Sequence, residues 1–235
     1  KMNNYLKILQ LEKQLLEESD NLHWSKWIDK DIQDWKTKQS TNHHRQSFGG
    51  MGSINDIAIG ENDKNGAWKE NLFQLLKSMS WTFATKNKIE FPKISIQQFE
   101  GMICRKCEYS EISEYSVNDI LAKRNLPSLI NRLLPSENFL TLLKIEEITK
   151  ETTIVNECEK IKIALSNSSI NETQFYTVYP KCPKCEGENS CVYRWELLNN
   201  GNEFIIKRSS NNLKLEKEII KNKSKSWINK ILGYR

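Results

Sequence analysis

The stretches that decide the fold are two short cysteine motifs, Cys104-Arg105-Lys106-Cys107 and Cys182-Pro183-Lys184-Cys185. Each motif places two thiolates one tight turn apart, which is how a single loop contributes two ligands to one tetrahedral zinc ion. Two such loops supply four sulfur ligands, so the ion has no open position for a substrate. The sequence therefore predicts a structural Zn2+ site formed by Cys104, Cys107, Cys182 and Cys185, which ties residues 104 and 185 together.

The context of the cysteines favours metal over disulfides. The chain has six cysteines, which a secreted protein in an oxidising environment would join in three bridges. Its N-terminus lacks the charged and then apolar pattern of a signal peptide, and the sequence holds no run of about 18 apolar residues. We therefore expect a cytoplasmic protein, whose paired cysteines stay reduced and bind metal.

The spacing of the motifs departs from a simple zinc ribbon, in which each cysteine loop caps a β-hairpin. The 74 residues from 108 to 181 separate the two motifs, so a helical insertion is expected between them. Gly187 lies two residues after Cys185, where a glycine one residue after is more usual. These departures leave open that Cys191 replaces one ligand, whereas Cys158 is interpreted as a lone thiol in or near a strand.

The first part of the chain has apolar residues at helical spacing. The spacing predicts helices over residues 2–18 and 66–86, and a further helix between them that carries an apolar stripe from Trp24 to Trp35. Asp29, Lys30, Asp31 and Asp34 lie off that stripe. Burial of the tryptophans in a core is favoured over an exposed stacking platform, because their rings bury large areas. Residues 1–90 are therefore predicted to form a helical domain.

After residue 90 the sequence alternates between segments with the pattern of a helix and segments with the pattern of a strand. A strand is expected to lead into the first motif, and capping residues together with Pro127 predict separate short helices between residues 118 and 149. Residues 152–155 and 161–165 alternate in hydropathy and are predicted as strands, and Asn199-Asn200-Gly201-Asn202 predicts a hairpin turn. The fold class predicted is α+β, with a zinc-ribbon-like antiparallel β domain over 94–210, a helical insertion over 116–150 and a basic C-terminal helix over 211–235.

A glycine-rich loop follows the second predicted helix. It reads Phe48-Gly49-Gly50-Met51-Gly52-Ser53-Ile54-Asn55-Asp56 and comes directly after His43, His44 and Arg45. Here the sequence resembles a family of uncharacterised bacterial helical domains with a Phe-Gly-Gly-Met-Gly-Ser-x-Asn-Asp signature, over roughly residues 1–90. The family has no established activity, so the resemblance implies a helical bacterial domain and no mechanism.

Two interpretations of this loop compete. In the functional one, its backbone N–H groups bind an anion and Asp56 orients a histidine for acid–base chemistry. In the structural one, which we favour, the glycines allow a tight crossing and Ser53 with Asp56 forms a capping box. The pattern is not a P-loop, because the Gly-Lys-Ser/Thr ending is missing. An enzyme or enzyme subunit with a site at His43, His44, Ser53 and Asp56 remains the alternative.

The charge distribution points to a binding function. The net charge is +5, and the 29 residues from Lys207 to Arg235 carry nine basic and two acidic residues, or +7, which leaves −2 for the rest. Lys221, Lys223, Lys225, Trp227 and Lys230 are predicted to contact nucleic acid or a protein partner, the alternative being a solvated amphipathic helix. All three histidines precede residue 45, far from the cysteines, which argues against a His-containing zinc nuclease or deaminase site. We therefore expect a non-enzymatic, zinc-stabilised binding or adaptor protein.

Overall fold

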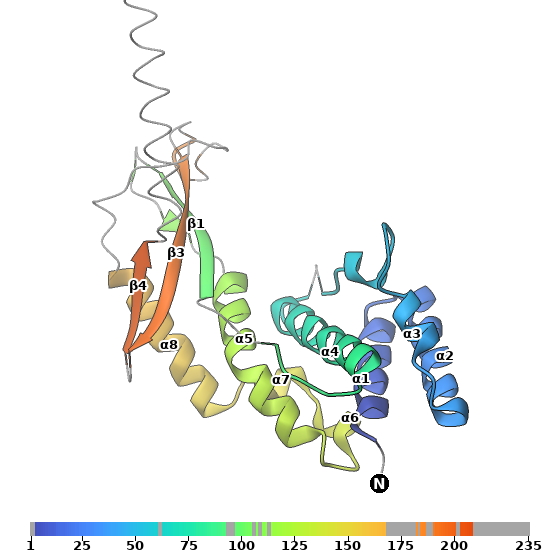
Figure 1. Cartoon of the computed structure of the whole chain (residues 1–235). Helices are drawn as coiled ribbons and strands as arrows, with labels where there is room; N and C mark the ends of the chain where they lie inside the picture. Colours follow the sequence, from blue (N-terminus) through green and yellow to red (C-terminus); the bar gives the residue numbers. More distant parts are fainter. Residues whose placement is uncertain are drawn as a thin grey trace, which may run out of the picture. The chain divides into compact units, whose positions relative to one another are not determined.

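A computed structural model gives the fold (Figure 1). It describes residues 3–60, 63–92, 97–104, 107, 110–111, 114–167, 182, 184–186, 190–200 and 203–208. The chain forms two compact units, which we call the helical unit (residues 1–94 and 118–157) and the sheet unit (residues 95–117 and 158–235). Most of the described residues are helical.

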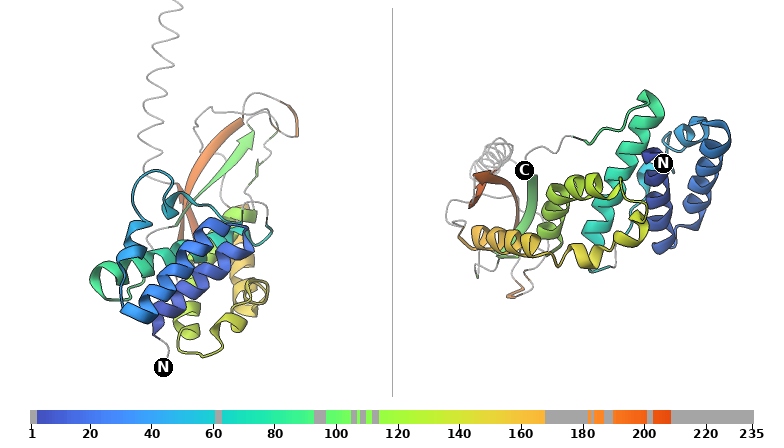
Figure 2. Two further views of the ribbon diagram at one scale, coloured as in Figure 1. Left: turned by 90° about the vertical axis from the view of Figure 1, so that its right-hand side faces the viewer. Right: turned by 90° about the horizontal axis from the view of Figure 1, so that it is seen from below.

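The helical unit begins with two helices, α1 (Asn4–Glu18) and α2 (Leu22–Lys38), which lie side by side (Figure 2). Asn3 begins α1, because its side chain accepts a hydrogen bond from the backbone N–H of Tyr5. The short α3 (Asn42–Gln46), a 3-10 turn η1 (Ile54–Asp56) and the long α4 (Gly66–Lys86) follow. The helices predicted over residues 2–18 and 66–86 are confirmed.

The core of this unit contains the apolar faces that the spacing predicted. The largest fully buried side chains on α1 and α4 are those of Tyr5, Ile8, Leu9, Leu11, Leu16, Trp68, Leu72, Phe73 and Leu76. Trp24 and Trp35 of α2 are also buried, at 8% exposure each. Tyr5 stacks on Phe83 at a centroid distance of 4.3 Å and meets Trp35 edge-on at 4.9 Å. The tryptophans at these two positions therefore serve packing, as the favoured interpretation predicted.

The helical unit is completed by a segment far along the chain. It comprises most of α5 (Glu114–Leu133), then α6 (Phe139–Leu142), α7 (Ile145–Ile148) and the start of α8 (Thr152–Asn167). Lys7 of α1 is buried, and its ammonium donates hydrogen bonds to the carbonyls of Leu134 (2.5 Å) and Ser136 (2.7 Å) at the end of α5. A cation beside these terminal carbonyls is favourable and fixes α1 to this segment.

The described residues of the sheet unit form four antiparallel strands in the order β2-β1-β3-β4. These are β1 (Gln97–Cys104), β2 (Ser110–Glu111), β3 (Ser190–Asn200) and β4 (Glu203–Arg208). Cys104 at the end of β1 is opposite Ser190 at the start of β3, and Asn200 is opposite Glu203. The register therefore places the end of β1 beside the start of β3.

The predicted fold class is wrong. Residues 152–155 and 161–165, expected as strands, lie in α8, and Cys158 is therefore on a helix. Pro127, expected to separate two helices, lies inside α5. The segment expected as an insertion in a β domain, residues 116–150, belongs almost entirely to the helical unit. Within its described residues, the chain is mainly helical and does not show an antiparallel zinc-ribbon-like domain with a helical insertion.

Some predictions fall on residues that the structure does not describe. They include the whole of the basic helix predicted over 211–235. The predicted boundaries 1–90, 94–210 and 211–235 therefore stay predictions. Among the described helices, none combines the length and the apolar character that crossing a membrane requires.

Candidate functional site

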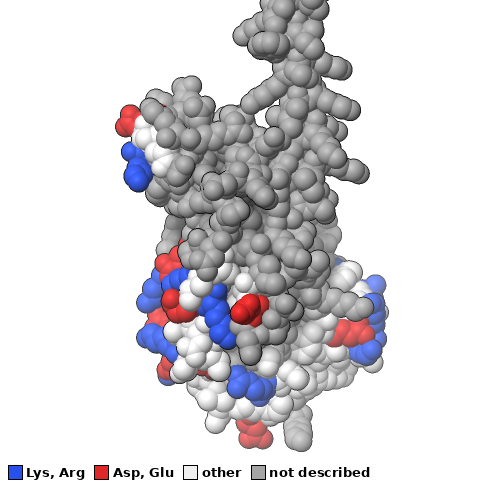
Figure 3. All heavy atoms as spheres, turned by 90° about the vertical axis from the view of Figure 1, so that its left-hand side faces the viewer, with Lys and Arg blue, Asp and Glu red and all other residues white. Residues whose placement is uncertain are grey.

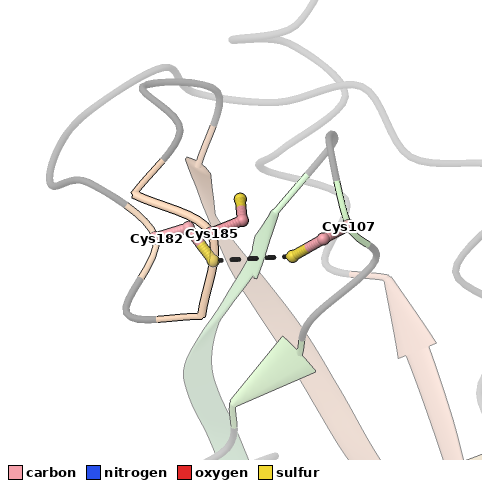
Figure 4. A group of neighbouring side chains, drawn as sticks. All are labelled: Cys107, Cys182 and Cys185. Carbon is pink, nitrogen blue, oxygen red and sulfur yellow. Dashed lines mark hydrogen bonds between the residues drawn. The ribbon is translucent and has the colours of Figure 1, made fainter.

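Three cysteines from the two motifs meet in the sheet unit. The sulfur atoms of Cys107, Cys182 and Cys185 all lie within 4.8 Å of one another (Figure 4). The Cys107 and Cys182 sulfurs are 3.7 Å apart, although 75 positions separate these residues in the sequence. Cys182 is fully buried, and the other two are half-buried. Three converging thiols with this burial can hold a metal ion.

The backbone around the second motif supports this arrangement. The N–H of Lys184 lies 3.4 Å from the Cys182 sulfur, and the N–H of Glu186 donates to the Cys182 carbonyl at 2.8 Å. The first contact partly neutralises a thiolate, and the second closes the turn. Glu186 has φ +54°, a left-handed conformation that favours glycine. The turn therefore needs its left-handed residue directly after Cys185, where this sequence carries glutamate and not glycine.

The structure describes the other three cysteines, Cys104, Cys191 and Cys158, in different detail. Cys104 ends β1, three residues before Cys107, and only its backbone is described. Ile103 pairs with Ser110 in the β1–β2 ladder, so Cys107 lies in the connection between these two strands, which begins directly after Cys104. Cys191 pairs with Ile103 in the β1–β3 ladder. Cys158 is half-buried on α8, and burial raises the pKa of its thiol. It stands apart from the three-thiol cluster.

The helical unit holds a second cluster, centred on Asp31 of α2. The two oxygens of this buried carboxylate accept from His43 Nδ1 at 2.5 Å and His44 Nδ1 at 2.8 Å. His43 also stacks on Trp27, with ring centroids 4.4 Å apart. One carboxylate thus fixes both histidines of α3 against α2. Sequence reasoning missed Asp31, since it was placed off the apolar stripe.

The glycine-rich loop is closed by its own residues. Ser53 and Asp56 form the predicted capping box around η1, in which Asp56 accepts from the N–H groups of Gly52 (2.7 Å) and Ser53 (3.1 Å). The Asp56 carboxylate is therefore engaged by the loop, and Asp31 takes the place beside the histidines that the functional interpretation gave to Asp56. Met51, at the centre of the loop, is fully exposed.

The loop offers a test of which glycines it requires. Gly52 has φ +75° and open space where a Cβ atom would lie, whereas Gly49 has the same open space and no positive φ. We expect Gly52→Ala to lower the free energy of unfolding by about 1 kcal/mol, because an L-residue is strained there. Gly49→Ala is the matched control and should leave the urea midpoint unchanged or slightly raised. Equal losses in both variants would contradict this assignment.

Charged side chains do not mark a further site on the face in Figure 3. Lys and Arg are intermixed with Asp and Glu over the described surface in that view, without a broad patch of one sign. The predicted contact residues Lys221, Lys223, Lys225, Trp227 and Lys230 lie outside the described residues.

Comparison with known protein families gives a match over part of the helical unit. The family model described as a domain of unknown function (DUF6966) matches residues 17–67. This segment holds α2, α3, the glycine-rich loop and the start of α4. No curated protein and no solved structure matches the chain. The chain is therefore similar to an uncharacterised domain family over the segment that carries Asp31, His43 and His44.

Proposed function

We propose that the protein is a non-enzymatic binding protein of a reducing bacterial cytoplasm, whose sheet unit is stabilised by a structural Zn2+ ion and which contacts nucleic acid. The observation that carries the proposal is the convergence of Cys107, Cys182 and Cys185 from two distant segments. Cys104 is the fourth ligand in this proposal. With four thiolates the ion would hold the fold together and offer no position for catalysis.

The geometry of the thiols supports zinc as the metal. A tetrahedron with Zn–S bonds of about 2.3 Å has sulfur–sulfur edges of about 3.8 Å. The Cys107–Cys182 separation of 3.7 Å matches that edge. The backbone of Cys104 ends β1 in register with Ser190, so the proposed fourth ligand lies at the end of the strand that leads to Cys107.

The arrangement of the helical unit supports a non-enzymatic role. His43 and His44 both use Nδ1 to bond Asp31, and Asp56 is occupied by the capping box. These groups thus perform structural tasks, which is the interpretation that the sequence favoured for the loop.

The distribution of charge supports nucleic acid as the partner. The basic segment with a net charge of +7 begins at Lys207, within β4, so it continues directly from the sheet unit. Lysines next to a tryptophan suit a phosphate backbone with accessible bases, because ammonium groups contact phosphates and an indole ring stacks on bases.

The test is the salt dependence of DNA and RNA binding, measured by fluorescence anisotropy with labelled single-stranded and double-stranded oligonucleotides. We expect affinity to fall steeply with salt. A variant with Lys221, Lys223 and Lys225 changed to Gln should reduce the slope of log K against log salt by about 2 to 3, since each lost phosphate contact removes somewhat less than one unit.

A matched control changes three exposed lysines of α2, Lys26, Lys30 and Lys36, to Gln. This control removes the same charge and should leave the slope unchanged if the basic segment makes the contacts. Absence of binding at low salt, or equal effects of the two variants, would overturn the nucleic-acid proposal and direct the search to a protein partner.

A further inference from the structure

The core of the helical unit contains ionisable groups that packing alone does not require. Glu12 of α1 has no exposed surface, and among the described residues neither of its carboxylate oxygens has a hydrogen-bond partner of normal geometry, although the Ser80 hydroxyl lies close. His44 is 1% exposed, and its Nε2 is likewise without a partner. Buried polar atoms are normally paired, because an unpaired one loses its hydration without replacement. The core of the helical unit thus contains two titratable side chains, Glu12 and His44, with three buried and unpaired polar atoms between them.

The groups around Glu12 come from every helix packed near it. Tyr5 shares α1 with it, Asp31 faces it from α2, His44 from α3, and Lys77 with Ser80 from α4. The ammonium of Lys77 donates to the Ile54 carbonyl at 3.1 Å and lies over the Phe73 ring. His43 is joined to the group through Asp31. Two buried carboxyl groups therefore share one core with Lys77 and the two histidines.

The hydrogen bonds of Asp31 limit where protons can reside. Because an ionised Asp31 accepts from Nδ1 of both histidines, each of these atoms carries a hydrogen, and Nε2 of a neutral His44 is then an acceptor. With Glu12 ionised as well, the core would hold a second buried negative charge beside that of Asp31. A proton on Glu12 removes this second negative charge from the core.

We propose that this core is a proton-sensitive switch, in which loss of the proton on the buried Glu12 carboxyl group loosens the packing of α1 against α4. Burial raises the pKa of Glu12 from its ordinary 4.5 to about 7, although His44, Ser80 and Lys77 favour the ionised form. The switch therefore operates in the neutral range. It is independent of the metal centre and of nucleic-acid binding.

The direction of the pH effect follows from the raised pKa. Between 4.5 and about 7 the folded state keeps a proton that the unfolded chain has released. The contribution of Glu12 to the free energy of unfolding is therefore at its maximum below pH 4.5, falls as the pH rises towards 7, and remains low above pH 7. From pH 5 to pH 8 the contribution of Glu12 to the folding equilibrium constant is expected to fall by about 70-fold.

The test is urea unfolding of the full chain between pH 5 and pH 8, followed by the fluorescence of the tryptophans of the helical unit. Glu12→Gln keeps the size of a neutral carboxyl group and cannot lose a proton. We expect it to remove most of the decline and to be more stable than the native chain at pH 8. The control is Glu18→Gln on the same helix, whose exposed carboxyl should leave the decline intact.

A second measurement holds even if Glu12→Gln fails to fold. Carbon-13 NMR of the Glu12 carboxyl group in the native chain should show a titration midpoint near 7, together with faster amide hydrogen exchange in α1 above that pH than intrinsic rates explain. A Glu12 midpoint near 4.5 would overturn the proposal. So would a decline of the same size in Glu12→Gln and in the native chain.

Discussion

Replacement of Cys182 by alanine is expected to abolish metal retention and to unfold the sheet unit. Cys182 is the fully buried member of the three-thiol cluster and lies 3.7 Å from the Cys107 sulfur. Loss of a hydrogen-bond partner behind a metal ligand already costs about 10-fold to 100-fold in affinity. Removal of a thiolate ligand itself should therefore lower zinc affinity by more than about 100-fold, and the folding free energy that the ion supplies is lost with it.

Metal content per chain and amide hydrogen exchange of β1 and β3 measure this effect. Protein purified under reducing conditions should hold about one zinc ion per chain, and Cys182→Ala should hold almost none. The strands should exchange faster in the variant and after treatment with a chelator, whereas α1 and α4 should keep their protection.

Cys158→Ala is the matched control for this experiment. Cys158 is a half-buried thiol on α8 that stands outside the cluster, so its removal should leave the zinc content unchanged. The metal prediction fails if the native chain holds well under one ion. It also fails if Cys158→Ala loses as much zinc as Cys182→Ala does.

Sequence reasoning reached the thiol cluster because ligand spacing is a local property. Two cysteines three positions apart can reach one metal ion from a single tight turn, whatever the rest of the chain does. The path of the chain between the motifs was predicted less well. The β-branched residues 152–155 and the alternation at 161–165 favoured strands. However, Ile154 and Ile161, seven positions apart, are both buried in α8, which is a helical period that the alternation concealed.

Pro127 shows how tertiary packing overrides a local signal. A proline inside a helix removes one backbone hydrogen bond and costs about 3 kcal/mol or more, so a helix break was predicted. Leu126 and Ile130, on either side of it, are almost fully buried in α5. Burial of large aliphatic side chains contributes about 2 kcal/mol each, which is enough to offset the proline over one continuous helix.

The histidine cluster could not be predicted from spacing, because its central residue is remote in sequence. His43 and His44 stood out beside the glycine-rich loop, and Asp56 was considered as their partner. Their actual partner, Asp31, is 12 and 13 positions earlier on another helix. An aspartate at the edge of an apolar stripe is usually solvated, and only the packing of α3 on α2 reveals that this one is buried.

Replacement of Asp31 by alanine is expected to destabilise the helical unit by about 3 kcal/mol, because two hydrogen bonds to one buried carboxylate are lost and their donors are left unpaired. The carboxylate has an exposed side-chain fraction of 1%, and each oxygen bonds a different histidine. Without it, both Nδ1–H groups lose their acceptor, and the one on His44 remains buried. Urea unfolding at constant pH, followed by tryptophan fluorescence, gives the free energy.

Asp31→Asn separates charge from hydrogen bonding at the same position. An amide has one acceptor oxygen and one donor nitrogen, so it can accept from only one histidine and forces the other to move its hydrogen from Nδ1 to Nε2. Asp31→Asn should therefore lose less stability than Asp31→Ala, and NMR should show a changed tautomer for one of the two rings.

The control is Asp34→Ala on the same helix, which removes a carboxylate that bonds Lys38 at the surface. Exposed pairs of this kind contribute little, so its stability should remain close to that of the native chain. If Asp31→Ala were as mild as Asp34→Ala, the carboxylate would not hold α3 on α2. The two histidines would then have to be fixed by their ring contacts alone, His43 by Trp27 and His44 by Tyr5 and Phe48.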